Sequence, residues 1–306
     1  MTLATPHPAE RPALGIALRI LSGLLFAAMV VCIKAVSLDV PLGQVVFFRS
    51  FFALIPLVIF LWLRKEFPGG LKTKRPFGHL ARSGFGALAM FASFASIARL
   101  PVAEASLIGH LTPVFTALAA AILLSERLTL WRIGGVALGL AGVLVLVWPE
   151  LGQGETDETD MRRLAGYGYG LAMAVLTAFA LIMVRSLNRT ESPGAIAFYF
   201  VVVSMLGGIA TLPWGWEVPD GTTLALLVLS GLFGGMAHIA MTLAFRNAEA
   251  SRLAPFEYIA LIWPVLADLL IFRLAIAPAF VLALPLVLAG AALAAMEGLP
   301  RRKKAA

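Results

Sequence analysis

The chain carries a few ionisable side chains inside long apolar segments, and these are the first candidates for chemistry. His110 lies beside Thr112 and Pro113 in the middle of one segment, and His238 lies in the middle of another. Histidine changes its charge near neutral pH, so either ring could bind a substrate or relay a proton. The alternative for both is a histidine that is only hydrogen-bonded in the packing. No further ligands stand at metal-binding spacing, so no metal site is predicted.

Three basic side chains fall within or at the ends of such segments. An unpaired charge at the centre of a bilayer costs about 2.5–3.5 kcal/mol. Lys34 and Arg185 lie near segment ends, where they could reach the headgroups or pair with a substrate anion or a gate acid. Arg49 lies deeper, and we expect it to bond helix-end carbonyls or a buried acid. All three are candidates for gating or charge pairing.

Two acids occupy the ninth apolar segment. Glu257 could pair with a nearby arginine, and Asp268 could pair with Arg273 or belong to a gate. Any proton exchanged inside these segments would have to be taken by one of these acids or by a histidine. Either acid therefore has a structural and a functional interpretation.

Proline divides two of the apolar segments. Pro113 and Pro264 lie near the middles of the fourth and the ninth segment. A proline frees one backbone carbonyl, which a membrane tolerates only against protein or water. Broken helices of this kind often line transporter cavities, and a static kink is the alternative.

Aromatic and sulfur side chains could supply the rest of a pocket. Met90 and Phe94 share one helical face at a spacing of four residues. With a few hydrogen-bonding groups, such side chains suit an amphiphilic metabolite such as a hydrophobic or aromatic amino acid. The predicted substrate-binding residues are His110, Thr112, Met90, Phe94, His238, Met241, Glu257, Tyr258 and Trp263.

The composition shows what must position these residues. Hydrophobic residues make up 60% of the chain and charged residues 13%, against about a quarter charged in soluble domains. We therefore expect an all-α integral membrane protein with ten transmembrane helices. The predicted segments are 13–36, 42–64, 77–98, 102–124, 130–148, 166–187, 194–214, 222–245, 252–272 and 277–297.

The charged residues between these segments predict the topology. Every even-numbered connection is basic, whereas the odd-numbered ones are acidic or nearly neutral. Basic connections stay cytoplasmic, so both termini are expected in the cytoplasm. The net charge of +7 is thereby explained without nucleic acid as a partner.

The two halves of the chain nearly match at an offset of 148 residues, which places Gly142 on Gly290. Five segments per half is an odd number, so the second half would enter the membrane from the opposite side as an inverted repeat. The predicted units are a disordered tail 1–12, a first repeat 13–149, an acidic external linker 150–164, a second repeat 165–297 and a basic cytoplasmic tail 298–306.

With these features the sequence resembles the drug/metabolite transporter superfamily, in its ten-helix branch of two EamA repeats. The resemblance rests on Lys34, Arg49, Pro113, Glu126 and the stretch 254–263. It departs from the family pattern at the end of the ninth segment, where an arginine and a leucine replace the expected glutamate. The resemblance implies transport of amino acids, nucleotide-like metabolites, sugars or drugs.

The sequence thus predicts a secondary transporter of the bacterial inner membrane that exports hydrophobic or aromatic amino acids by alternating access. Uptake or exchange of another metabolite, such as a nucleotide-like compound or a drug, is the alternative. An intramembrane enzyme lacks a catalytic motif here, and a channel would need a more polar pore. The expected partners are a small-molecule substrate, the lipid bilayer and protons. No cofactor is expected, and the protein would be a monomer or a weak homodimer.

Overall fold

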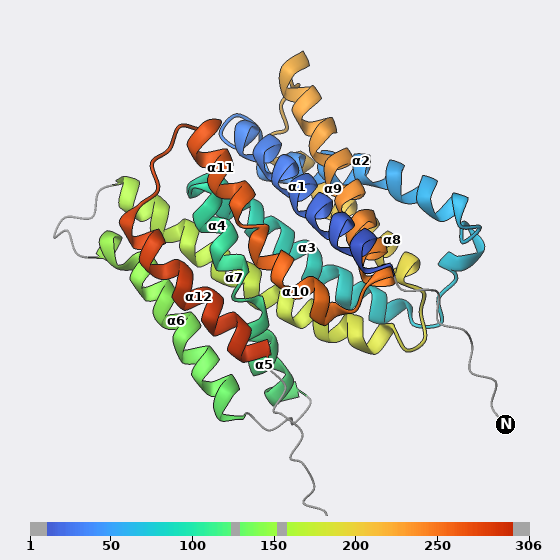
Figure 1. Ribbon diagram of the computed structural model, residues 1–306. Coiled ribbons are helices and arrows are strands. Elements are labelled where there is room, and N and C mark those ends of the chain that lie inside the picture. Colours follow the sequence, from blue (N-terminus) through green and yellow to red (C-terminus); the bar gives the residue numbers. More distant parts are fainter. Residues whose placement is uncertain (1–10, 124–128, 152–157, 296–306) are drawn as a thin grey trace, which may run out of the picture.

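The computed structural model describes residues 11–123, 129–151 and 158–295 of the chain (Figure 1). The expectations for the N-terminal tail, the centre of the acidic linker, Glu126 and the basic C-terminal tail lie outside these residues. All regular secondary structure within them is helical. The helices are α1 (Pro12–Val36), α2 (Leu42–Leu63), η1 (Gly69–Leu71), α3 (Pro76–Arg99), α4 (Val102–Gly109), α5 (Thr112–Leu123), α6 (Leu130–Leu151), α7 (Glu158–Leu187), α8 (Pro193–Ile209), η2 (Leu212–Trp214), α9 (Gly221–Asn247), α10 (Ala250–Ile259), α11 (Ile262–Leu270) and α12 (Pro278–Ala295).

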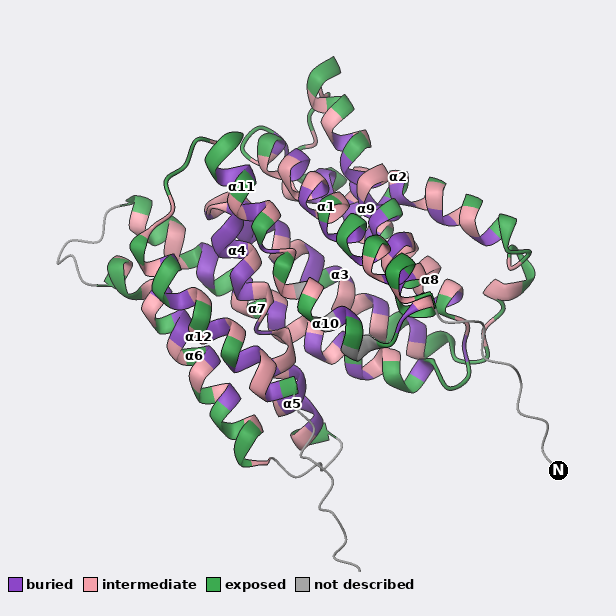
Figure 2. Ribbon diagram, in the orientation of Figure 1, coloured by how far each residue is buried: buried purple, intermediate pink, exposed green. Residues whose placement is uncertain are grey.

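The helices are long and apolar enough for a membrane. In the described residues, eight helical segments could cross a bilayer by length and composition, with α4 and α5 counted together. The apolar helix α8 is shorter, and the ninth predicted segment forms the α10–α11 pair. Large apolar side chains are exposed around the molecule, as expected of a surface that faces lipid. Figure 2 shows the buried residues on the inward faces of the helices.

The fourth and ninth segments are each broken into two helices. Pro113 is the second residue of α5, and Pro264 is the third residue of α11. At the start of a helix the missing proline N–H has no intrahelical acceptor in any case. The residue before each proline, Thr112 or Trp263, already belongs to the second helix, and the first helix ends earlier, at Gly109 or Ile259. Both breaks leave backbone polar groups inside the molecule.

Hydrogen bonds join connections that lie on the same side of the molecule, as expected if successive helices cross the membrane in opposite directions. Arg75, at the basic start of α3, donates to the carbonyl of Ser186 at the end of α7, at 3.1 Å. On the opposite side, Gln44 at the start of α2 donates to the carbonyl of Glu217 at 2.7 Å. Basic connections therefore contact basic ones. The placement of both termini in the cytoplasm and the inverted repeat remain predictions.

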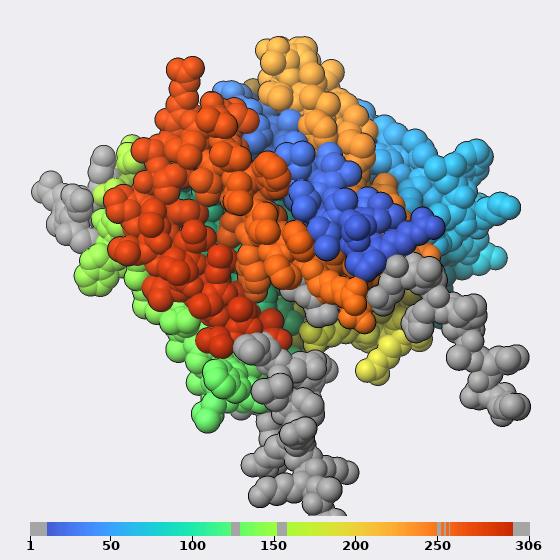
Figure 3. Space-filling view, viewed as in Figure 1, coloured from blue at the N-terminus to red at the C-terminus, as the bar shows by residue number. Residues whose placement is uncertain are grey.

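Small residues let the helices pack closely. A Cβ on Gly135 of α6 would lie 2.7 Å from the carbonyl oxygen of Gly290 in α12, so the two backbones touch. Helix α1 packs along α9, and α3 packs along α7. In the space-filling view, α12, the α10–α11 pair and α1 form the near surface (Figure 3).

Candidate functional site

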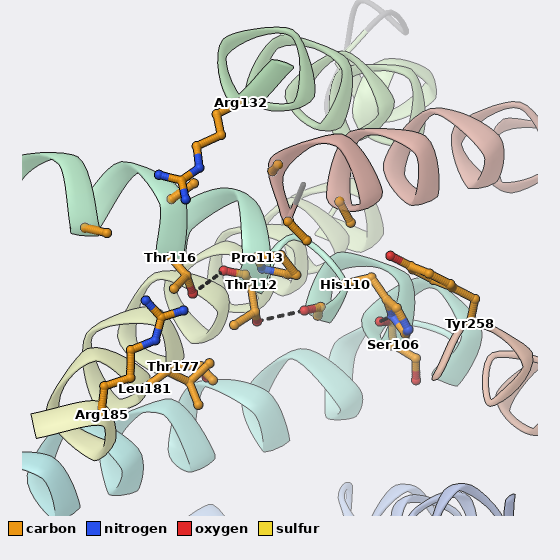
Figure 4. A pocket seen from close by; sticks show the side chains of 16 residues that line it. Ser106, His110, Thr112, Pro113, Thr116, Arg132, Thr177, Leu181, Arg185 and Tyr258 are labelled. Carbon is orange, nitrogen blue, oxygen red and sulfur yellow. Dashed lines mark hydrogen bonds between the residues drawn. The ribbon is translucent and has the colours of Figure 1, made fainter. Parts of the chain in front are cut away.

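A cavity of about 670 Å³ lies beside the break between α4 and α5 (Figure 4). Small-molecule sites typically occupy roughly 300–1,000 Å³. Its walls come from both halves of the chain. The lining residues are Ser106, Gly109, His110, Thr112, Pro113, Thr116, Ala117, Ala120, Arg132, Thr177, Leu181, Arg185, Tyr258, Ala291, Ala294 and Ala295.

One end of the cavity is formed by the helix break. The Nδ1–H of His110 donates to the carbonyl of Ser106 at 2.9 Å, because a carbonyl can only accept. In the neutral ring Nε2 is then an acceptor. Thr112 donates its hydroxyl proton to the carbonyl of Gly109 at 2.8 Å, which uses one of the carbonyls that the break releases. The break thus presents an imidazole and hydroxyl oxygens to the cavity.

Tyr258 of α10 brings an aromatic ring to the same end. Its ring centroid lies 6.3 Å from that of His110, with 34° between the planes. This spacing is within the range of interacting rings. The two rings come from opposite halves of the chain and flank one end of the cavity (Figure 4).

Two arginines lie at the other end. Arg132 is in the first turn of α6, and Arg185 is in the last turn of α7. Figure 4 shows both guanidinium groups on the side away from His110 and Tyr258. Arg132 is half-buried and Arg185 is exposed. Both belong to basic connections, so this end of the cavity is on the side expected to face the cytoplasm.

On the opposite side of the molecule, Asp268 of α11 is hydrogen-bonded to the start of α4. This side chain is fully buried and accepts the N–H groups of Val102 at 3.0 Å and Ala103 at 2.8 Å. Both amides belong to the first turn of α4, which has no intrahelical acceptor for them. The partner expected from the sequence was Arg273. Asp268 instead joins the second half of the chain to the broken helix of the first.

Lys34 makes a similar contact nearby. Its ammonium group donates to the carbonyls of Ile97 and Leu100 at 2.8 Å each, at the C-terminal end of α3. A cation at this position interacts favourably with the partial negative charge of the helix end. Lys34 therefore points into the protein.

A buried charge cluster, which sequence reasoning missed, fixes the start of α4. Arg163 of α7 donates to Glu104 at 3.1 Å and to Glu150 of α6 at 2.6 Å. Tyr167 also donates to Glu104, at 2.7 Å. Glu104 is only 3% exposed, so its charge requires these partners. The signal for it was an acid near the start of an apolar segment and a tyrosine one turn after an arginine.

Four of the other predicted residues do not line the described cavity. Met90 is buried near Ser50, and Phe94 lines a smaller space of about 170 Å³. Trp263 packs next to Gly23 of α1. Met241 is half-buried and is not among the described lining residues. The side chain of Glu257 lies outside the described part of the structure.

His238 and Arg49 contact each other and do not line the cavity either. The Nη2 group of Arg49 lies 3.3 Å from Nε2 of His238. Arg49 was expected to meet helix-end carbonyls or an acid, and its partner is an imidazole instead.

Helices α4, α5, α7 and α12 contribute most of the described lining. Helices α3 and α9, which carry four of the predicted binding residues, contribute none of it. Arg132, Ser106, Thr116 and Thr177 were missed, because the sequence places Arg132 in a connection and small hydroxyl residues are frequent in apolar helices. Among the described residues, no group of three or more His, Cys, Asp or Glu side chains could hold a metal ion.

Comparison with known proteins gives the family. Residues 13–148 match the sequence model of the EamA-like transporter family. A riboflavin transporter of Rhizobium johnstonii is 28% identical over 305 residues, which cover 97% of this chain and 96% of the relative. The pseudopaline exporter CntI of Pseudomonas aeruginosa is 30% identical over 255 residues, covering 81% and 84%. An S-adenosylmethionine uptake transporter of Rickettsia felis is 27% identical over 229 residues, covering 75% and 74%.

A solved crystal structure shares the fold. It has a TM-score of 0.64 and 21% identity, and the match covers 93% of this chain and 97% of the other. The relatives are bacterial transporters, and the chain is an integral protein of the inner membrane that moves small molecules. The chain belongs to the EamA-like transporter family.

Proposed function

We propose that the protein is a secondary transporter that exports a small amphiphilic metabolite, in the first place a hydrophobic or aromatic amino acid, by alternating access. The observation that carries the proposal is the cavity at the helix break. It has two rings at one end, two arginines at the other and mostly small side chains between them. A molecule with a flat or apolar part at one end and an anionic group at the other would fit between the rings and the arginines.

The residues have distinct tasks in the proposal. The rings of His110 and Tyr258 hold the apolar part of the substrate, and hydroxyl oxygens at the break accept from its amino group. The guanidinium groups of Arg132 and Arg185 attract its carboxylate, since arginine matches a planar carboxylate in shape and charge. An amino acid enters from the cytoplasm with its anionic end nearest the mouth.

Alternating access then requires the opposite side to open. In the proposal, the present state faces the cytoplasm, and the bonds from Asp268 to the start of α4 keep the outer side closed. Release outside requires α11 to separate from α4 while the arginine end closes. His110 is the cavity group best suited to take a proton, because its Nε2 is an acceptor in the neutral ring.

Uptake or exchange of another metabolite is the second candidate, and the names of the relatives are compatible with it. They include an uptake transporter as well as an exporter, so family membership leaves the direction open. A nucleotide-like substrate would use the same rings and arginines. Channel and enzyme activities have no comparable support.

Counterflow in proteoliposomes tests the proposal. Vesicles preloaded with unlabelled phenylalanine should accumulate labelled phenylalanine, and labelled leucine more weakly. Replacing Tyr258 with leucine should raise the half-saturating concentration several-fold. The matched control is Tyr169→Leu, because Tyr169 lies outside the cavity against Arg99.

Three results would count against parts of the proposal. Exchange of riboflavin or a nucleoside but of no amino acid would exclude the substrate class. Equal effects of the two tyrosine variants would exclude the cavity as the binding site. Finally, cells preloaded with labelled phenylalanine should lose it faster when they contain the protein. Slower loss would indicate that the protein takes phenylalanine up instead of exporting it.

A further inference from the structure

Two arginines with buried guanidinium nitrogens lie away from the cavity, and the first of them contacts a histidine. Arg49 of α2 is 3% exposed, and its Nη2 lies 3.3 Å from Nε2 of His238 in α9. A guanidinium group can only donate, so His238 accepts at Nε2 and carries its proton on Nδ1. The ring is then neutral, and the full charge of Arg49 remains. Its Nε and Nη1 atoms are buried without a hydrogen-bond partner in the described part of the structure.

Arg82 of α3 is in the same situation. Its Nε and Nη1 atoms are also buried without a hydrogen-bond partner among the described residues. Its guanidinium carbon lies 4.4 Å from the ring centroid of Phe200 in α8. Nη1 lies 3.5 Å from where a Cβ on Gly86 would be, one turn further along α3. The side chain therefore extends toward the middle of the helix, although snorkelling would take it toward the nearer end at Pro76.

The two guanidinium groups belong to one polar site. Ser50, next to Arg49 in α2, contacts Met90 of α3, which lies one turn beyond the Gly86 that Arg82 reaches. Glycine makes room for Arg49, because a Cβ on Gly234 would lie 3.2 Å from its Nε. The site thus joins α2 and α3 of the first half to α8 and α9 of the second.

No described acid compensates these charges. The described ion pairs of the protein involve other residues, and none includes Arg49 or Arg82. The hydroxyl of Ser83, beside Arg82, is buried without a hydrogen-bond partner as well. Buried donors without acceptors are unfavourable, and a buried charge is more so. An external acceptor with negative charge would satisfy both requirements.

We propose that Arg49, Arg82 and His238 form a second binding site, which takes an oxyanion: the carboxylate or phosphate group of a small molecule. Guanidinium groups bind planar carboxylates and phosphates through two parallel N–H donors. His238 holds the guanidinium group of Arg49 in place through its Nε2 atom. The site is separate from the cavity, since none of the three residues lines it. The inference therefore does not depend on the transported substrate.

Anion binding to the purified protein tests this site. The full chain in an uncharged detergent is titrated with sodium phosphate, sodium acetate or sodium chloride at the same ionic strengths, and the midpoint of thermal unfolding is measured. Phosphate or acetate should raise the midpoint with saturation, because a ligand that binds only the folded state stabilises it. Arg49→Gln and Arg82→Gln should each abolish this shift. The matched control Arg64→Gln removes an arginine that pairs with Glu66 outside both sites and should keep it.

The unliganded variants provide a second readout. Without anion, Arg49→Gln and Arg82→Gln should unfold at the wild-type temperature or above, because each removes a charged group whose buried nitrogens have no acceptor in the described part of the structure. Should a glutamine variant not fold, Arg49→Lys or Arg82→Lys keeps the charge, and the shift should then need a several-fold higher anion concentration. The proposal is overturned if no anion gives a saturable shift, if chloride gives the same shift, or if the shift persists in both glutamine variants.

Discussion

Asp268→Ala should shift the protein toward a state that is open on the side opposite to the arginine end of the cavity. The Asp268 side chain is fully buried and accepts the amide protons of Val102 and Ala103 in the first turn of α4. Alanine leaves both amides without an acceptor while α11 stays packed on α4. Once the helices separate, water satisfies them. The substitution therefore destabilises the closed state relative to the open one.

The magnitude follows from these two hydrogen bonds. A buried donor left without a partner costs about 1–3 kcal/mol, so two cost about 2–6 kcal/mol. Relaxation of the surroundings onto the smaller alanine favours the lower part of this range, about 2–4 kcal/mol. At about 1.4 kcal/mol per factor of ten, the closed-to-open ratio falls roughly 30- to 1,000-fold. Asp268→Asn keeps one acceptor oxygen and should have about half the effect in free energy.

A single reporter cysteine can measure the shift. In a Cys32→Ser background, which removes the only cysteine, Ala103→Cys places a thiol at a position that is 1% exposed. Its labelling by a membrane-impermeant maleimide added to cells should accelerate when Asp268→Ala is introduced. Val201→Cys, 5% exposed in a separate core cluster, is the matched control and should not change. Equal labelling of Ala103→Cys with and without Asp268→Ala would refute the reasoning, and a parallel rise at Val201→Cys would indicate general unfolding.

Two further predictions concern stability. Gly290→Ala should destabilise the protein by about 1–3 kcal/mol, because the new Cβ would lie 2.7 Å from the Cα of Gly139. Gly134→Ala, which meets open space, should instead stabilise it by about 0.4–1 kcal/mol, and equal thermal unfolding midpoints for the two variants would contradict this packing. The hydrogen bond from His79 lowers the pKa of Glu191, so its contribution is present above the ordinary glutamate pKa of about 4.3 and is lost as the pH falls through the lowered value. Glu191→Gln should therefore unfold at a lower temperature at pH 7 but lose less on acidification, and an unchanged acid dependence would exclude this role.

The sequence was a good guide to everything that depends on the solvent and on local backbone chemistry. A bilayer requires long apolar helices, so the helical class and the approximate limits of the helices follow from hydropathy alone. Proline at positions 113 and 264 acts through its own ring and missing N–H, and the chain breaks into two helices beside both. The family resemblance rested on the same local features.

The contact partners of the polar side chains did not follow from the sequence. Asp268, Lys34 and Arg49 were identified as important, but their contacts lie 166, 63 and 189 residues away along the chain. Such contacts depend on how the helices are rotated and shifted against one another, and apolar helices carry little sequence information about rotation.

The sequence by itself therefore determined a helical membrane transporter, the two helix breaks and the set of side chains that can ionise or bind a ligand. Only the tertiary structure decided that His110 and Tyr258 meet at one end of a cavity whose other end holds Arg132 and Arg185. It also decided that Arg49, His238 and Arg82 gather elsewhere. The physical reason is that hydrophobic burial is non-directional and selects helices as a class, whereas hydrogen bonds and close glycine contacts select one arrangement among them.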